Sequence, residues 1–219
     1  MPILNSILTP EQIKIEIWHI TETVDELLNL VILTPAGRRL FDSYRNEKRK
    51  KEWLASRLLL QNLNNGNPVT VRYTKKGRPF KQKSMPWFSI SHTTDYVAVA
   101  SSISAPVGVD IETISARILK IKNRFLSSIE LNQLNDTSDI ATLMTCWCIK
   151  EATIKHLDLP GIDFQNNIQI QISQSKSLSH VDVQITEKKN RTLTAITPSL
   201  SDKFILSYTI NPIDNEIQF

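Results

Sequence analysis

The sequence predicts an α+β fold in which small, mainly antiparallel sheets are packed with helices. Apolar residues at alternate positions, as at Ile13, Ile15 and Ile17, predict a strand with one buried face. A Thr-x-x-Glu capping pattern at 23–26 and a Thr-Pro pair at 34–35 predict the starts of two helices. Four alternating or apolar runs separated by polar turns, which are typical of an antiparallel sheet, follow at 168–172, 181–185, 193–197 and 204–210.

The chain of 219 residues is long enough for one large domain or two closely packed halves. Residues 1–104 have 15 Lys and Arg against 9 Asp and Glu, whereas residues 105–219 have 11 against 13. Residues 48–83 alone contain 11 basic side chains and one acidic side chain, Glu52. We therefore expect a basic N-terminal half that binds an anion and a more acidic C-terminal half, with a merely solvated basic face as the alternative.

Composition argues against a membrane protein or a disordered protein, because 41% of the residues are hydrophobic and 22% are charged. The longest strongly apolar stretch, 27–33, is interrupted by Asn29 and is far shorter than the roughly 20 residues of a membrane span. The N-terminus lacks the pattern of a secretory signal, so we expect a cytoplasmic protein. Cys146 and Cys148 are two residues apart on a predicted helix, which favours packing over a disulfide or a zinc site.

A long helix is predicted in the N-terminal half from about Tyr44 to Leu63. Leucines at 54, 58 and 63 would form its apolar stripe, while Lys50 and Arg57 would lie on a basic side that faces a ligand. A cation-rich turn follows at 75–79, where glycine allows a close approach of the backbone.

Residues 87–92 and 96–100 are predicted to form a hairpin, with His92 at its bend. A single histidine at the end of a strand is usually structural, so His92 becomes a candidate ligand only together with its neighbours.

Two carboxylates in the sequence Val109-Asp110-Ile111-Glu112 are predicted to share one face of a strand, with the two apolar residues directed into the core. Like charges about 4 Å apart repel by about 4 kcal/mol at an effective dielectric of 20, so this face needs a cation. Glu151 would add a third carboxylate, and oxygen ligands of this kind suit Mg²⁺ with waters and substrate phosphates.

The segment 147–155, WCIKEATIK, is predicted to be helical and to place Glu151 and Lys155 one turn apart on one face. An exposed Glu–Lys pair that adds about 0.3–0.5 kcal/mol is the simpler interpretation of this segment alone. The carboxylate pair at 110 and 112 favours a functional interpretation instead.

Six segments together resemble the 4′-phosphopantetheinyl transferases of the surfactin-synthetase-activating type. They occur in the order found in that family and span about half of the chain, and the ordered set is more specific than any single segment. The segments are RKKEWLASR (49–57), KGRPF (76–80), FSISH (88–92), GVDIE (108–112), RFLS (124–127) and WCIKEATIK (147–155).

The resemblance implies transfer of the 4′-phosphopantetheine arm of coenzyme A to a serine of an acyl or peptidyl carrier protein, with release of adenosine 3′,5′-bisphosphate. Asp110, Glu112 and Glu151 match the Mg²⁺ ligands, and Glu151, Lys155 and Asp110 would be catalytic. Lys150 matches a motif position whose role is less defined. The implied contacts to coenzyme A are Arg49, Arg57, Lys75, Lys76, Gly77, Arg78, Pro79, Ser91, His92 and Lys155.

The same resemblance implies a pseudo-two-fold pair of similar halves, with the active site in the cleft between them. Arg78 departs from the lysine that the family usually has, which changes the donor geometry while keeping the charge. The base that takes the serine proton would be Glu151 or a metal-held water, and residues alone do not separate the two. We expect a monomer. Phe125 and Leu126 are candidates for carrier docking, with core packing as the favoured alternative.

Two other functions fit parts of the sequence. A Mg²⁺-dependent phosphodiester hydrolase could use the same carboxylates and would act without a carrier protein. A nucleic-acid-binding module could use the cations of 48–83, but the aromatic residues nearby form no clear stacking platform. We therefore expect neither a nucleic acid nor a membrane among the partners.

Overall fold

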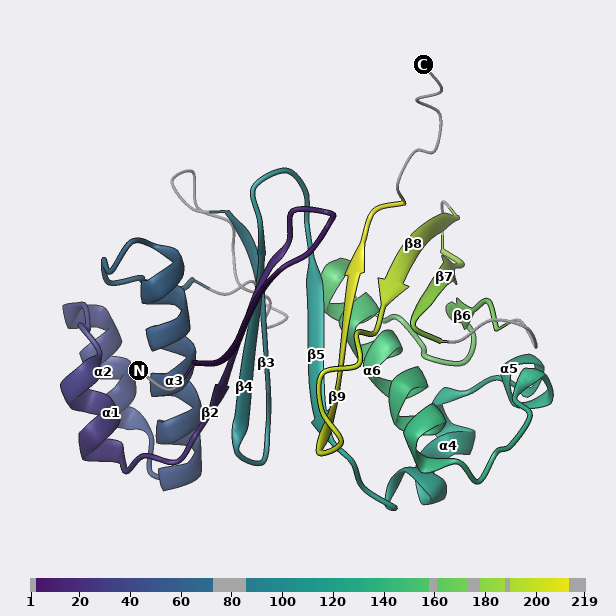
Figure 1. Cartoon of the computed structure of the whole chain (residues 1–219), viewed down its shortest axis with the longest axis horizontal. Coiled ribbons are helices and arrows are strands. Elements are labelled where there is room, and N and C mark those ends of the chain that lie inside the picture. The colour runs from purple at the N-terminus through teal and green to yellow at the C-terminus, as the bar shows by residue number, and fades with distance from the viewer. Residues whose placement is uncertain (1–2, 73–85, 158–160, 173–177, 188–189, 213–219) are drawn as a thin grey trace. The chain divides into compact units, whose positions relative to one another are not determined.

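The computed structural model describes residues 3–72, 86–157, 161–172, 178–187 and 190–212. The chain forms two compact units, which are residues 1–104 (the first unit) and residues 105–219 (the second unit). Each unit has one antiparallel sheet with its helices packed against it (Figure 1). The predicted α+β class is confirmed.

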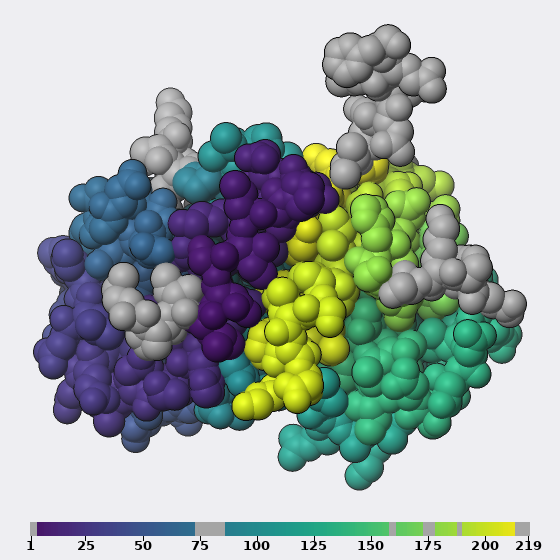
Figure 2. Space-filling view, in the orientation of Figure 1, coloured from purple at the N-terminus to yellow at the C-terminus, as the bar shows by residue number. Residues whose placement is uncertain are grey.

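The first unit contains a four-stranded sheet in which every neighbouring pair is antiparallel. The predicted hairpin is present as β3 and β4, with Thr93 paired to Tyr96 at its closed end. In sheet order the strands are β1 (Ile3–Leu8), β2 (Lys14–His19), β4 (Tyr96–Ser102) and β3 (Trp87–Thr93). The N-terminal segment, dark purple in Figure 2, forms part of the surface of this unit, and Leu4 and Leu8 of β1 are exposed there.

Three helices cover the sheet of the first unit: α1 (Val24–Leu30), α2 (Pro35–Ser43) and α3 (Glu47–Leu63). The predicted capping box at the start of α1 is confirmed, because Thr23 and Glu26 cap each other's backbone amides. Helix α1 ends at Leu30. Thr34 caps α2 with proline in its first turn, as predicted.

Strand β2 is buried on both faces, so the prediction of a single buried face is wrong. Ile15 and Ile17 are buried, and so are Glu16 and Trp18 between and beside them. The Glu16 carboxylate is stabilised by the ammonium of Lys14 at 2.8 Å and by the side-chain amide of Asn62, which donates to it at 2.7 Å.

Helix α3 is not the two-sided helix that the sequence predicts. It begins at Glu47, after the cap residue Asn46, and its residues 52–60 are all buried. The reason is that α3 packs against α1 as well as against β2 and β4, which leaves this stretch no solvent face. Arg57, expected on an exposed basic side, is therefore buried.

The second unit has a five-stranded antiparallel sheet that contains all four strands predicted after residue 165. Its strands, in sheet order, are β5 (Gly108–Thr113), β9 (Phe204–Ile210), β8 (Arg191–Ile196), β7 (His180–Ile185) and β6 (Ile168–Ile170). The strand that comes first in the chain thus pairs with the last one.

Helix α6 (Ile140–Leu157) packs against this sheet, accompanied by α4 (Ile118–Phe125) and α5 (Ser128–Gln133) (Figure 1). The apolar cluster of the unit includes Leu143 and Ile149 of α6 with Ile168, Val183 and Leu193 of the sheet. Ser127 caps α5 in a capping box with Glu130.

Cys146 and Cys148 are free, buried thiols on α6, which confirms their prediction as packing residues. Burial raises the pKa of Cys146 to about 12, so this thiol stays protonated. Within the described part of the chain, none of the helices is long and apolar enough to cross a membrane.

Candidate active site

Strand β5 and helix α6 are in direct backbone contact, and Gly108 makes this contact possible. A Cβ atom on Gly108 would lie 2.0 Å from the carbonyl oxygen of Ala152 and 2.8 Å from the amide nitrogen of His156. The Thr209 hydroxyl of the neighbouring strand β9 donates to the same Ala152 oxygen at 3.2 Å. A larger residue than glycine would therefore push the strand away from the helix.

The face of β5 that carries Gly108 also carries Asp110 and Glu112, because side chains alternate along a strand. The predicted alternation is confirmed, but the carboxylates lie on the face that packs against α6. Val109 and Ile111 are buried on the other face and do not belong to the apolar cluster under α6. The expectation that the apolar pair is directed into the core is therefore confirmed, and Gly108 admits α6 on the polar face.

Asp110 forms an ion pair with Lys155 that joins the strand to the helix. The Lys155 ammonium donates to Asp110 Oδ1 at 2.6 Å. The Asp110 side chain is only 4% exposed, whereas that of Lys155 is 28% exposed. The pair joins β5 to α6, so Lys155 is not simply an exposed residue on the helix surface.

Glu151 lies one turn before Lys155 on α6 and is half-buried. Burial, followed by repulsion from Asp110 and then from Glu112, raises the pKa of Glu151 to about 7, while Lys155 acts in the opposite direction. The charges of Asp110 and Glu112 therefore both act on Glu151 in this unit. Their combined negative charge exceeds what one ammonium neutralises.

The Cys148 thiol lies in the same region, three residues before Glu151. Burial, with further contributions from the charges of Asp110 and Glu112, raises the pKa of this thiol well above its usual value. The thiol therefore stays neutral beside the carboxylates and adds no charge to this region.

The three carboxylates do not form a complete metal-binding site. Among the residues that the structure describes, no three His, Cys, Asp or Glu side chains are grouped so that they could hold a metal ion as they stand. One oxygen of Asp110 contacts the Lys155 ammonium instead. The donor set consists of hard oxygens, which is the chemistry that Mg²⁺ prefers.

In the first unit, Arg49 of α3 and His92 of β3 lie side by side. Arg49 Nη1 is 2.8 Å from His92 Nε2, and His92 Nδ1 is 3.5 Å from a carboxylate oxygen of Glu52. Because a guanidinium only donates, Nε2 accepts and Nδ1 carries the proton toward Glu52. The side chains of Arg49 and His92 are 46% and 40% exposed, so a ligand can reach both.

The other predicted contacts of the first unit differ in accessibility. Arg57 is buried, stacks over the Trp53 ring at 4.5 Å and donates to the Ser56 hydroxyl at 3.1 Å. Ser91 is also buried. The predicted residues Lys75, Lys76, Gly77, Arg78 and Pro79 lie outside the described residues.

Residues 106–208 match the 4′-phosphopantetheinyl transferase superfamily. This segment of the chain is therefore similar to that superfamily. The match covers most of the second unit and includes Asp110, Glu112, Glu151 and Lys155. The resemblance inferred from the sequence motifs is thereby confirmed.

Curated relatives carry the same description. The 4′-phosphopantetheinyl transferase gsp of Aneurinibacillus migulanus is 35% identical over 108 residues, which are 48% of this chain and 45% of that protein. The 4′-phosphopantetheinyl transferase AcpT of Escherichia coli strain K12 is 31% identical over 113 residues, which are 49% of this chain and 57% of that protein. The chain thus spans about half the length of the curated relatives it matches.

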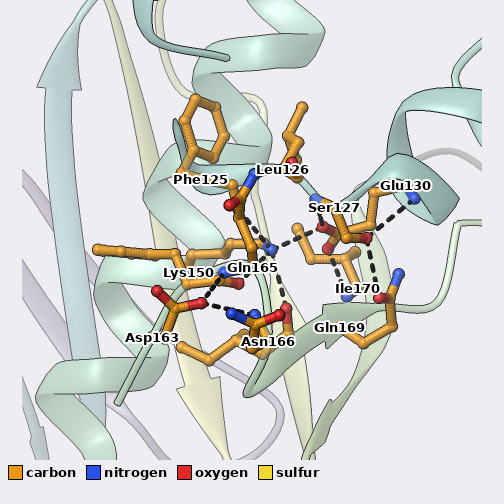
Figure 3. A network of polar contacts seen from close by, with 12 residues as sticks. Phe125, Leu126, Ser127, Glu130, Lys150, Asp163, Gln165, Asn166, Gln169 and Ile170 are labelled. Atoms are coloured by element: carbon orange, nitrogen blue, oxygen red, sulfur yellow. Dashed lines mark hydrogen bonds and ion pairs between the residues drawn. The ribbon is translucent and has the colours of Figure 1, made fainter. Parts of the chain in front are cut away.

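Lys150, whose role the sequence leaves undefined, is fully buried in the superfamily segment (Figure 3). Its ammonium donates to Glu130 Oε2 at 2.7 Å and to the carbonyl oxygens of Phe125, Phe164 and Ile168 at 2.7–2.8 Å. The sequence analysis missed Glu130. The only signal for it was the Ser-x-x-Glu capping box, which does not reveal a lysine partner 20 residues away.

Phe125 and Leu126 are also buried, at the end of α4 in this superfamily segment. The assignment of carrier docking to them is therefore wrong, and the alternative of core packing is confirmed. The Phe125 ring contacts Trp147 of α6 edge to face, which explains the burial.

Proposed function

We propose that this protein is a 4′-phosphopantetheinyl transferase that moves the 4′-phosphopantetheine arm of coenzyme A to a serine of an acyl or peptidyl carrier protein. The observation that carries this proposal is the Asp110–Lys155 pair beside Glu151, on β5 and α6 within the segment that matches the superfamily. These residues combine anionic and cationic groups, as transfer of a phosphoryl-linked arm requires.

In this reaction the serine oxygen forms a bond to the phosphorus that carries the pantetheine arm. The bond between that phosphorus and the bridging oxygen of the diphosphate breaks, and adenosine 3′,5′-bisphosphate leaves with that oxygen. The serine proton passes to a base on the enzyme. The chain must therefore supply a proton acceptor and must neutralise charge at the diphosphate.

Asp110, Glu112 and Glu151 would hold a Mg²⁺ ion. Support for this assignment comes from the raised pKa of Glu151, which burial causes first and repulsion from Asp110 and Glu112 second, because a divalent cation would relieve that repulsion. When bound, Mg²⁺ would neutralise charge on the diphosphate of coenzyme A. Lys155 would then donate to the diphosphate from the leaving-group side.

Glu151 is our candidate for the acceptor of the serine proton, either directly or through a water that it orients. Its pKa of about 7 in the metal-free protein suits proton uptake near neutral pH. A bound cation lowers the pKa of a carboxylate that ligates it, which favours the route through water.

The first unit would bind the phosphates of coenzyme A. Arg49 and His92 are exposed neighbours. The contacts predicted for Lys75, Lys76 and Arg78 stay predictions. Coenzyme A has a diphosphate and a 3′-phosphate, so several separated cations are needed. Direct contacts from the buried Arg57 and Ser91 stay predictions.

The test is incubation of the protein with coenzyme A, Mg²⁺ and a panel of unmodified carrier proteins, followed by intact-mass measurement. We expect at least one carrier to gain a single phosphopantetheine group, and EDTA to abolish the gain. A carrier with its acceptor serine replaced by alanine is the matched control. If no carrier is modified, the proposal is overturned.

The same incubation without a carrier tests the hydrolase alternative, and a nucleic-acid binding assay tests the other. A phosphodiester hydrolase would release adenosine 3′,5′-bisphosphate without a carrier. A nucleic-acid-binding module would show salt-dependent RNA or DNA affinity that survives Asp110→Ala.

A further inference from the structure

Lys150 and Glu130 form a closed ion pair inside the second unit. The exposed fraction of each side chain is 0%, and their charged atoms are 2.7 Å apart. The Glu130 carboxylate also accepts from the backbone amides of Ser127 at 2.8 Å and Ile170 at 2.9 Å. Both charges are thus neutralised and hydrogen-bonded without access to water (Figure 3).

The acceptors of the Lys150 ammonium come from three segments that are separate in the sequence. Phe125 ends α4 and Glu130 lies on α5. Phe164 precedes β6, and Ile168 is the first residue of β6. Because hydrogen bonds to an ammonium are directional, they fix both the rotation of α6 about its axis and its position along that axis. Apolar contacts alone would permit more sliding.

The opposite side of α6 contacts the strands that carry the candidate active site. Ala152 accepts from the Thr209 hydroxyl, and His156 Nδ1 lies 3.1 Å from the Thr209 carbonyl oxygen. Successive residues of a helix are rotated by about 100°, so the direction of Lys150 determines the direction in which Glu151 points.

Stability alone does not require an ion pair at this place. A buried ion pair can often be replaced by well-packed apolar side chains with little or no loss of stability. What the apolar replacement lacks is a set of directed contacts between α6 and three other segments.

We infer that Lys150 is a positioning residue: its enclosed ammonium, together with Glu130, holds α6 in the rotation at which Glu151 and Lys155 face Asp110. This inference rests on the proposed transferase function for its kinetic readout. Lys150 does not contact the reacting groups, and it acts only through the helix.

The test compares wild type with Lys150→Met and with the double variant Lys150→Met/Glu130→Gln. The single variant leaves the Glu130 charge buried without its lysine, so we expect a large loss in thermal midpoint. The double variant removes both charges at similar side-chain volume, and we expect it to recover most of that loss. Its kcat is nevertheless expected to stay about 10- to 100-fold below wild type, with KM for coenzyme A unchanged within about twofold.

Leu143→Ala is the matched control, because Leu143 is a fully buried apolar residue of the same helix. It should lower the thermal midpoint by leaving a cavity but keep kcat within about twofold of wild type at temperatures where it is folded. The inference is overturned if the double variant regains wild-type kcat together with its stability. It is also overturned if Leu143→Ala loses as much kcat as the double variant.

Crystal structures of the wild type and the double variant separate this inference from the proposed function. A rotated or shifted α6, with Glu151 moved relative to Asp110, supports the positioning role even if wild type modifies no carrier. An α6 that superposes on that of wild type overturns the positioning role, whatever the activity of the protein.

Discussion

Lys150 and Lys155 lie five residues apart on α6 and form two different kinds of ion pair. The pair of Lys150 with Glu130 is closed, with both side chains 0% exposed and three carbonyl oxygens around the ammonium. The pair of Lys155 with Asp110 is open, because Lys155 is 28% exposed. An enclosed ammonium cannot change partners, whereas an open one can turn from a carboxylate to an incoming phosphate.

The difference shows how α6 can be fixed in place by Lys150 while Lys155 remains accessible to a ligand. A closed pair contributes a fixed direction, and breaking it leaves an uncompensated charge in the interior. An open pair contributes less to stability but keeps a charged group accessible to a ligand. The predictions below test whether Lys150 has a mainly structural role and Lys155 a mainly functional one.

The largest expected effect is on stability, from breaking the closed pair. Lys150→Ala should lower the free energy of unfolding by about 3–5 kcal/mol, because Glu130 is left buried and charged without its lysine. Lys155→Ala should cost less, since its pair is partly open to solvent. Urea unfolding of both variants measures the difference, and equal losses would contradict the division.

Substitutions in the open pair and at the neighbouring Glu151 should have the largest effects on activity. Asp110→Ala and Glu151→Ala are each expected to lower kcat/KM for carrier modification by at least about 10³-fold, or about 4 kcal/mol, without changing the circular dichroism spectrum. Near-normal turnover in either variant would refute the assignment of these carboxylates to the metal.

Gly108→Ala should disturb the contact between β5 and α6, because the added Cβ would lie 2.0 Å from the Ala152 carbonyl oxygen. We expect a loss of about 1–3 kcal/mol in stability together with reduced activity. Gly37→Ala in α2 is the control, since the added Cβ would lie 3.3 Å from its nearest neighbour, the hydroxyl oxygen of the cap residue Thr34. Similar thermal midpoints for the two variants would argue against a tight contact at Gly108.

The burial of Glu151 and its repulsion by the other carboxylates should appear in the pH dependence of the metal-free protein. The pKa of Glu151 is raised from its usual 4.5 to about 7, so between these values the folded state binds more protons than the unfolded state. This contribution therefore lowers stability as pH rises from about 4.5 to 7, and the loss persists above pH 7.

Glu151→Gln removes that contribution. With EDTA present, the variant should be more stable than wild type by about 1–3 kcal/mol at pH 8 and of equal stability at pH 4. Urea unfolding at the two pH values provides the measurement. A constant difference between variant and wild type across this range would show that Glu151 does not experience the predicted repulsion.

The smallest effect is expected in the first unit. Arg49→Ala should raise KM for coenzyme A by about tenfold, equivalent to about 1.4 kcal/mol, and leave kcat unchanged, because it removes binding that is equal in the ground and transition states. Arg45→Ala, at an exposed arginine between α2 and α3, is the control. If Arg49→Ala leaves KM unchanged, Arg49 does not bind coenzyme A.

Local sequence signals predicted much of the fold. The Thr23 and Glu26 capping box, the hairpin of β3 and β4 and the four last strands all depend on neighbours within a few residues. The alternation along β5 likewise placed Asp110 and Glu112 on one face. These features need no knowledge of distant parts of the chain.

The remaining features depend on contacts between distant residues. A lysine is normally exposed, and the acceptors of Lys150 lie 14 to 25 residues away, so its burial has no local signal. The enclosure of α3 by α1, β2 and β4 in the same way buries Arg57, which the helical pattern alone places on a basic surface. The side of β5 that meets α6 is decided by Gly108 rather than by the apolar residues.

The pairing of β5 with β9 has a consequence during synthesis on the ribosome. Asp110 is translated about midway through the chain, but its strand obtains its hydrogen-bonded neighbour only when residues 204–210 emerge. A nascent chain interrupted before that point would already contain every carboxylate and lysine discussed above. It would still lack the strand that places Asp110 in the sheet.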